Sequence, residues 1–133
     1  KLNEVRLRVD SQNELNGAIL ATGFPFKQPN LMPTQFAIMN NLIDEAADFR
    51  RTGSAALDLC YVASGRVDGY FEMGLKPWDC AAGDLIVREA GGLVCDFNAG
   101  HGYLRSGNIV AAPARILKEM LNKIQPCLTE QVK

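Results

Sequence analysis

The residues best suited to chemistry in this sequence are concentrated between positions 77 and 92. This stretch begins with the residues P-W-D-C-A-A-G and ends with R-E-A-G-G. Asp79 precedes an apolar segment that is predicted to be helical, so its carboxylate would lie beside unpaired backbone N–H groups and the positive end of the helix dipole. A phosphate, or a metal bound to a phosphate, is well placed at such a terminus.

Each feature of this stretch also has a purely structural interpretation. An aspartate before a helix is most often a cap, with no metal involved. Trp78 would then be a large side chain in the core, and Gly91 and Gly92 would only end the helix. The individual residues do not decide between the two interpretations.

The apolar pattern predicts the elements that must position Asp79. Short apolar runs bounded by turn residues indicate strands, and longer amphipathic stretches indicate helices. The predicted strands are 18–21, 67–72, 93–97 and 109–112, and the predicted helices are 34–49, 55–64, 79–90 and a last one that begins at Pro113 and extends to Ile124.

This order of elements predicts an α/β fold with a mostly parallel sheet flanked by helices. In the helix at 34–49, Thr34 would be the cap, and Phe36, Ile43 and Phe49 would belong to the buried stripe. An extended segment is predicted upstream, at residues 2–9, where apolar and polar side chains alternate.

The composition excludes several classes of function. The net charge is −1 with 14 basic and 15 acidic residues spread along the chain, so neither a nucleic-acid footprint nor a basic membrane patch is expected. No apolar run approaches the roughly 18 residues of a membrane span. The four cysteines form no C-x-x-C pair and His101 is the only histidine, which argues against zinc. We expect a reduced, cytoplasmic protein.

Taken together, the motifs resemble the inositol monophosphatase family, and its bacterial extragenic-suppressor branch in particular. The string W-D-x-A-A-G followed by E-A-G-G is similar to the second signature of that family. Residues 50–58 look like its G-[ST]-A-A segment, residues 67–74 look like its strand ending in Glu-Met-Gly, and residues 21–25 fit its A-T-G-F-P turn. The resemblance covers nearly the whole chain.

The resemblance implies a Mg²⁺-dependent, Li⁺-sensitive phosphomonoesterase that acts on inositol monophosphate or a similar polyol phosphate. It implies that Asp79 binds a metal ion and contacts the substrate phosphate, that Glu72 binds substrate hydroxyls, and that Gly53, Ser54 and Ala55 line the polyol pocket. Mg²⁺ prefers carboxylate oxygens and water, which suits an aspartate.

The chain departs from the family in one respect, because the Glu-Glu pair and the Asp-Pro-x-Asp-Gly-Thr stretch that supply the other metal ligands are absent. The chain also begins at Lys1 without an initiator methionine. We therefore expect it to be the C-terminal layer of the layered α/β sugar-phosphatase fold. Residues 1–16 would be the tail of an upstream part and residues 17–133 the C-terminal domain, with no catalytic residue of its own and no activity alone.

Other functions remain open from the sequence. Bacterial members of the resembling branch are implicated in ribosomal RNA antitermination, with RNA polymerase and Nus factors as partners, so an interaction protein is the alternative. A homodimer is expected. Arg50 and Arg51 could bind phosphate, although a basic pair after a helix more often faces solvent or the helix dipole. In the resembling family this neighbourhood lies near the subunit contact, so an interface role stays open. A phosphatase for nucleotide or fructose phosphates is a third interpretation, which the Glu-Met-Gly sequence disfavours.

Overall fold

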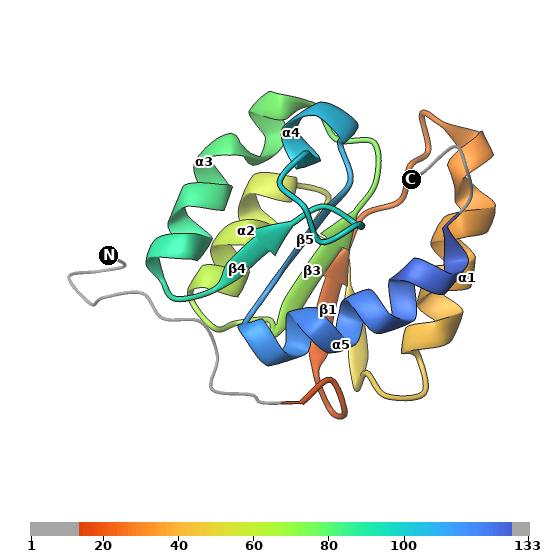
Figure 1. Ribbon diagram of the computed structural model, residues 1–133, viewed down its shortest axis with the longest axis horizontal. Helices are drawn as coiled ribbons and strands as arrows, with labels where there is room; N and C mark the ends of the chain where they lie inside the picture. The colour runs from red at the N-terminus through yellow and green to blue at the C-terminus, as the bar shows by residue number, and fades with distance from the viewer. Residues whose placement is uncertain (1–13, 129–133) are drawn as a thin grey trace.

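A five-stranded mixed sheet forms the centre of the molecule. The computed structural model describes residues 14–128, apart from the side chains of Cys80 and Ala82. The predicted extended segment at 2–9 and most of the predicted upstream tail lie outside the described residues. The sheet has the strand order β2-β1-β3-β5-β4 (Figure 1), formed by β1 (Ile19–Thr22), β2 (Asp48–Arg50), β3 (Gly69–Glu72), β4 (Leu93–Cys95) and β5 (Ile109–Ala112).

Four of the five strands run in the same direction. β1 pairs in parallel with both β2 and β3, whereas β5 is antiparallel to both β3 and β4. The prediction of a mostly parallel sheet is therefore confirmed for strand direction. The pairing is mixed because the one reversed strand, β5, lies between β3 and β4.

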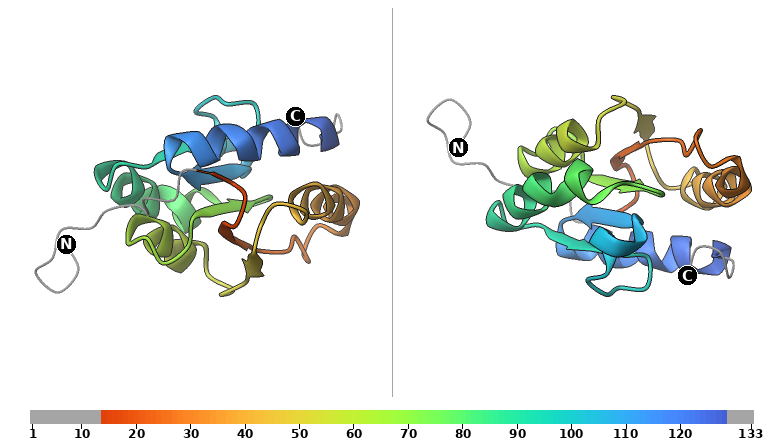
Figure 2. Two further views of the ribbon diagram at one scale, coloured as in Figure 1. Left: turned by 90° about the horizontal axis from the view of Figure 1, so that it is seen from below. Right: turned by 90° about the horizontal axis from the view of Figure 1, so that it is seen from above.

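Helices cover both faces of the sheet, which makes three layers (Figure 2). Helices α1 (Met32–Leu42) and α5 (Ala114–Ile124) contribute to one core, and α2 (Ala55–Ala63) and α3 (Pro77–Glu89) contribute to the other. The sheet divides the two cores because neighbouring residues of a strand point to opposite faces. Phe71 belongs to the first core and Tyr70 to the second, and both are fully buried.

The predicted helix at 34–49 is wrong in its second half. Helix α1 begins at Met32, with Leu31 as its N-cap, and Thr34 lies buried within it. It ends at Leu42, and the chain then turns into β2, where Phe49 pairs with Leu20 of β1. The apolar residues of this stretch match a helical period by coincidence, because pairing with β1 decides their structure.

The predicted apolar stripe of that helix is also wrong at two positions. Phe36 and Ile43 are 57% and 58% exposed, whereas Ile38 and Leu42 are fully buried. Phe49 does pack against the first core, but from a strand. The other predicted helices and strands are present with ends shifted by a few residues, and the 109–112 strand has the predicted bounds.

Helices α2 and α3 approach each other closely at Gly83. A β-carbon at Gly83 would lie 2.7 Å from Cβ of Leu59, so only glycine fits at this contact. This close packing places the N-termini of α2 and α3 next to each other at the same end of the sheet.

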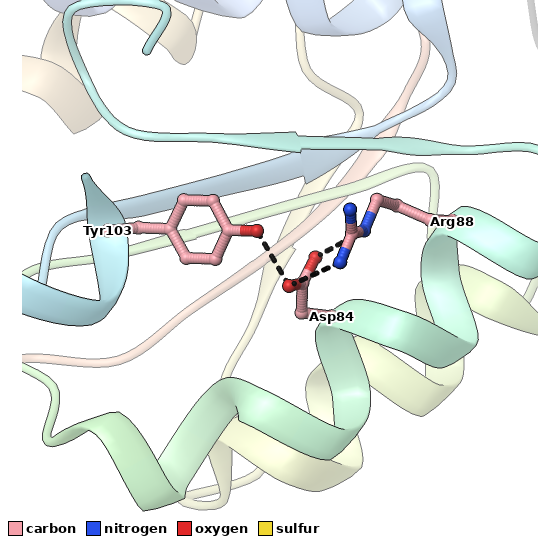
Figure 3. Close-up of polar contacts among 3 residues, drawn as sticks. All are labelled: Asp84, Arg88 and Tyr103. Atoms are coloured by element: carbon pink, nitrogen blue, oxygen red, sulfur yellow. Dashed lines mark hydrogen bonds and ion pairs between the residues drawn. The ribbon is translucent and has the colours of Figure 1, made fainter. Parts of the chain in front are cut away.

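The sequence did not predict the short helix α4 (Tyr103–Ser106). Hydrogen bonds and an ion pair among Asp84, Arg88 and Tyr103 connect α4 to α3 (Figure 3). The hydroxyl of Tyr103 donates to Oδ2 of Asp84 at 2.6 Å. Arg88 contacts the same carboxylate through Nη2 at 3.1 Å and Nε at 3.0 Å. Asp84 is 5% exposed, so this pairing compensates for the burial of its charge.

The described residues contain neither a membrane-crossing helix nor a disulfide. Between residues 14 and 128, no helix combines the length and the apolar character that crossing a membrane requires. Cys60, Cys95 and Cys127 are free thiols, and burial raises the pKa of Cys95 to about 11.

Candidate functional site

An open cleft of about 850 Å³ lies where β1 and β3 end and where α2 and α3 begin. In open α/β sheets, the carboxyl ends of parallel strands are the usual place for a ligand. The N-termini of two helices point to the same region and contribute unpaired N–H groups and positive dipole ends. The cleft is lined by residues 24–28, 53–56, 72–76, 78 and 79.

All five residues that the sequence singled out line this one cleft. Gly53, Ser54 and Ala55 form the turn into α2, Glu72 ends β3, and Asp79 belongs to the first turn of α3. These residues come from three segments, which the fold brings together. Their roles toward a ligand remain predictions.

Glu72 lies half-buried at the end of β3 and lines the cleft. Oε1 of Glu72 accepts a hydrogen bond of 2.6 Å from the hydroxyl of buried Tyr70. Burial raises the pKa of Glu72, and the negative charges of Asp58 and Asp79 raise it further, while the Tyr70 hydrogen bond and the charge of Arg51 oppose these effects. A carboxyl group held in this way can both accept and, when protonated, donate hydrogen bonds.

Asp79 is the third residue of α3 rather than its cap. The helix begins at Pro77 after Lys76, and Oδ2 of Asp79 accepts a hydrogen bond of 2.9 Å from the Lys76 N–H. This hydrogen bond fixes the carboxylate at the helix terminus, as in a capping box. Asp79 is partly exposed and lines the cleft, so its carboxylate is accessible to a ligand.

The donor set at this end of the cleft fits one ligand of a Mg²⁺ ion, not a complete site. Asp79 offers a hard carboxylate oxygen beside open space, which is the ligand type that Mg²⁺ prefers. Among the described residues, however, there is no group of three or more histidine, cysteine, aspartate or glutamate side chains that could hold a metal.

The turn into α2 has an unusual backbone conformation. Gly53 has φ of +84°, which side chains other than glycine rarely allow. Ser54 is the N-cap of α2, and its Oγ accepts a hydrogen bond of 3.2 Å from the N–H of Leu57. The cap therefore uses one N–H group of the first helical turn, and Ala55 and Ala56 line the cleft beside it.

Trp78 is the clearest residue that sequence reasoning misplaced. The structural interpretation made it a core side chain, but it is 77% exposed and lines the cleft. Lys76, Phe24 and Phe26 also line the cleft and were not predicted. No local signal in the sequence indicated this exposure, because successive side chains of a helix point in different directions and the position of Asp79 does not fix that of Trp78.

The remaining charged candidates are not among the residues that line the cleft. Arg50 forms an exposed ion pair of 3.4 Å with Asp48. The guanidinium of Arg51 lies 5.4 Å from the ring centroid of Phe26, which itself lines the cleft. His101 is exposed, in the loop after β4.

Comparison with known proteins identifies the family. The model of the inositol monophosphatase family matches residues 1–130. This chain belongs to the inositol monophosphatase family. The family resemblance that the motifs indicated is thereby confirmed.

Relatives in this family include two proteins called "Nus factor SuhB". The chain is 83% identical to the Haemophilus influenzae protein over 128 residues, which cover 96% of this chain and 48% of that protein. It is 56% identical to the Escherichia coli protein over 133 residues, which cover all of this chain and 50% of that protein. The chain thus spans about half the length of the curated relatives it matches. That this is their C-terminal half stays a prediction.

Solved structures of the family have the same fold. The extragenic suppressor protein suhB from Bartonella henselae superposes with a TM-score of 0.88 at 40% identity, covering 92% of this chain and 47% of that one. The inositol monophosphatase from Anabaena superposes with a TM-score of 0.86 at 35% identity, covering 93% of this chain and 51% of that one.

Proposed function

We propose that this chain is one half of a Mg²⁺-dependent, Li⁺-sensitive phosphomonoesterase that hydrolyses inositol monophosphate or a similar polyol phosphate. The observation that supports this most is the convergence of Glu72, Asp79 and the turn at 53–55 on one cleft, in a chain of the inositol monophosphatase family. The cytoplasm is the proposed compartment.

In this proposal the chain supplies the polyol side of the site. Glu72 binds substrate hydroxyls, because a carboxyl group can accept hydrogen bonds from a polyol and can donate one when protonated. The turn of Gly53, Ser54 and Ala55 lines the same cleft, where N–H groups at the start of α2 can donate to a hydroxyl oxygen. These contacts hold the substrate in one orientation with its phosphate near Asp79.

Asp79 is proposed to hold Mg²⁺ and to lie against the substrate phosphate. Bound Mg²⁺ would polarise the phosphoryl oxygens and lower the pKa of a bound water. The α3 terminus adds positive potential from its N–H groups, which favours the phosphate. We assign no catalytic residue within this half.

The chain alone is proposed to be inactive. Mg²⁺ gives up its water ligands reluctantly and needs several oxygen ligands, so one carboxylate binds it weakly. The other ligands would come from an upstream half, which would also cover part of the cleft. The substrate and this missing half are therefore the first two proposed partners.

A second copy of the chain is the third proposed partner. Phe24, Phe26 and Phe36 form a group of aromatic rings, with centroid distances of 5.6 and 6.2 Å from Phe24 to the other two. Phe26 and Phe36 are more than half exposed. An exposed aromatic group of this kind is typical of a protein–protein contact, and it supports the expected homodimer.

The alternative function is that of an interaction protein in ribosomal RNA antitermination. The observation that favours it is that relatives with 56–83% identity carry the name "Nus factor". RNA polymerase and Nus factors would then be the partners.

A complementation assay tests the proposed enzyme. The chain is purified alone and also together with the other half of the Haemophilus influenzae relative, and each sample is assayed with inositol monophosphate and excess Mg²⁺. We expect Li⁺-inhibited turnover only in the combined sample, and its loss in Asp79→Asn, since asparagine can still accept the Lys76 hydrogen bond. Asp44→Asn, on the exposed surface, is the control. Turnover by the chain alone would contradict the proposed division of the site, and full activity of Asp79→Asn would make Asp79 only a structural residue.

A further inference from the structure

The turn that precedes α2 receives almost no support from packing. Residues 51–54 are exposed, and a β-carbon placed on Gly53 would have no atom within 4 Å. A turn without packed neighbours is expected to be mobile unless hydrogen bonds fix it. The same turn must have one defined shape if it is to bind a small polyol.

The hydroxyl of Thr52 supplies such hydrogen bonds. Its Oγ1 accepts from the Ser54 N–H at 3.1 Å, so it bridges Gly53. It lies 2.9 Å from Oδ1 of Asp58 and 3.1 Å from the carbonyl oxygen of Ser54. A hydroxyl has one proton, and the shorter bond to a carboxylate is the stronger of the two alternatives.

The Asp58 carboxylate is buried, and its burial costs stability. It is 1% exposed, and burial raises its pKa to about 6 although the Thr52 hydrogen bond opposes this shift. Helix α2 does not depend on Asp58 for capping, because Ser54 already accepts the hydrogen bond from Leu57. An uncharged residue at this position would avoid the cost of burying the charge.

We propose that Thr52 and Asp58 form a positioning pair that holds the Gly53–Ser54–Ala55 turn in the shape that binds the polyol. Asp58 orients the Thr52 hydroxyl, and Thr52 in turn fixes the Ser54 N–H and the left-handed conformation at Gly53. Neither residue lines the cleft, so both are positioning residues. The charge of Asp58 also raises the pKa of Glu72, so Thr52→Val, which keeps that charge, is the cleaner probe of the turn. This inference rests on the proposed function for the substrate, but the geometry of the turn can be tested without it.

The first test measures amide hydrogen exchange of Ser54 by NMR in the full chain. We expect Asp58→Ala to lower the protection of the Ser54 N–H by about tenfold, although Asp58 does not touch that group, because the hydroxyl that accepts from it loses its orientation. Thr52→Val should do the same. The conservative variants Asp58→Asn and Thr52→Ser should keep the protection of the parent chain, since each retains a hydrogen bond between the side chains at positions 52 and 58. Unchanged protection in both Asp58→Ala and Thr52→Val would overturn the proposal.

Stability is measured in parallel to separate a local effect from unfolding. If Asp58→Ala does not fold, Thr52→Val decides, because valine and threonine have nearly the same volume and differ in the hydroxyl. Thr52→Ser, which keeps the hydroxyl, is its control. Protection that falls equally at Ser54 and at the buried strand β5 would indicate general loosening, and it would overturn a specific role in the turn.

The second test uses the combined sample of the complementation assay. Thr52→Val and Asp58→Ala should raise KM for inositol monophosphate by about tenfold and leave KM for phenyl phosphate, which has no sugar-like hydroxyls, within about twofold. Equal changes for both substrates would overturn the role in polyol binding. If the unmodified sample has no activity, the proposed function fails, while the exchange experiment still decides whether the pair holds the turn.

Discussion

The carboxylate of Glu72 lies directly over the α-carbon of Gly23. A β-carbon on Gly23 would stand 2.5 Å from Oε1 and 2.6 Å from Cδ of Glu72. Gly23 immediately follows β1 and is buried, and Glu72 ends β3, so the parallel pairing of the two strands brings the residues to the same end of the sheet. Glycine at position 23 is therefore what leaves room for the Glu72 carboxylate.

Gly23→Ala should move the Glu72 carboxylate and lower the free energy of unfolding by about 1–3 kcal/mol, the usual cost of one extra carbon in a packed place. Urea denaturation of the chain measures this change. The control is a double-mutant cycle, in which the same substitution is made in a Glu72→Ala background. The cost should be smaller there because the clashing group is gone. An equal cost in both backgrounds would show that the strain does not come from Glu72.

Asp58 should make the chain less stable as the pH rises from about 4 to about 6. Its pKa is 3.8 when unperturbed and about 6 in the fold, where burial is the largest cause. Between these values the folded chain binds more protons than the unfolded chain, so the free energy of unfolding falls with rising pH and is then constant above about pH 6. The loss amounts to roughly 2–3 kcal/mol.

Asp58→Asn should remove this loss, because asparagine can accept the Thr52 hydrogen bond without a charge. The variant should be more stable than the parent chain at pH 7 and equal to it near pH 3.5, as measured by urea denaturation at both pH values. The pKa of Glu72 is also raised, so Glu72 lowers the stability of both proteins as the pH rises. The quantity to interpret is therefore the difference in the free energy of unfolding between the two proteins. Asp44→Asn is the surface control. A constant difference at both pH values would contradict the assignment to Asp58.

The parts of the fold that the sequence predicted correctly are those with strong local signals. The short apolar run Ile109–Ala112, bounded by Gly107-Asn108 and Pro113, indicated a buried strand, and Gly53-Ser54 before an alanine-rich stretch indicated the start of α2. The end of α1 was missed because pairing with the distant strand β1 determines the structure of residues 48–50. Phe49 pairs with Leu20, and a local apolar period cannot report a contact across almost thirty residues.

The candidate site was predicted in its residues but not in its surroundings. Motifs indicated Glu72 and Asp79, and the structure brings both to one cleft. The contact of Glu72 with Gly23 depends on the pairing of β1 with β3, and the exposure of Trp78 depends on how the first turn of α3 lies on the surface. Contacts between elements that are distant in the sequence cannot be predicted from local residue patterns.

Tyr103→Phe should destabilise the chain by about 1–3 kcal/mol. The substitution removes the hydroxyl that donates at 2.6 Å to buried Asp84 and leaves that carboxylate with Arg88 alone (Figure 3). Urea denaturation measures the change. The matched control is Tyr61→Phe, because this half-buried ring keeps its contact with the Arg66 guanidinium without a hydroxyl. Equal effects of the two substitutions would indicate that the Asp84 contact adds no stability.

Glu72→Gln should raise KM for inositol monophosphate by about tenfold in the combined sample, and change KM for phenyl phosphate by less than about twofold. Glutamine is close in shape and can still accept the Tyr70 hydrogen bond, so the fold should be unaffected. What it loses is the charge, and with it the stronger hydrogen bonds that a carboxylate accepts from hydroxyls. Steady-state kinetics with both substrates measures the difference. Glu89→Gln, exposed at the far end of α3, is the control. Since the two substrates share a phosphate but not the polyol, an equal rise in KM for both would place Glu72 at the phosphate or in the structure of the cleft, and not at the hydroxyls.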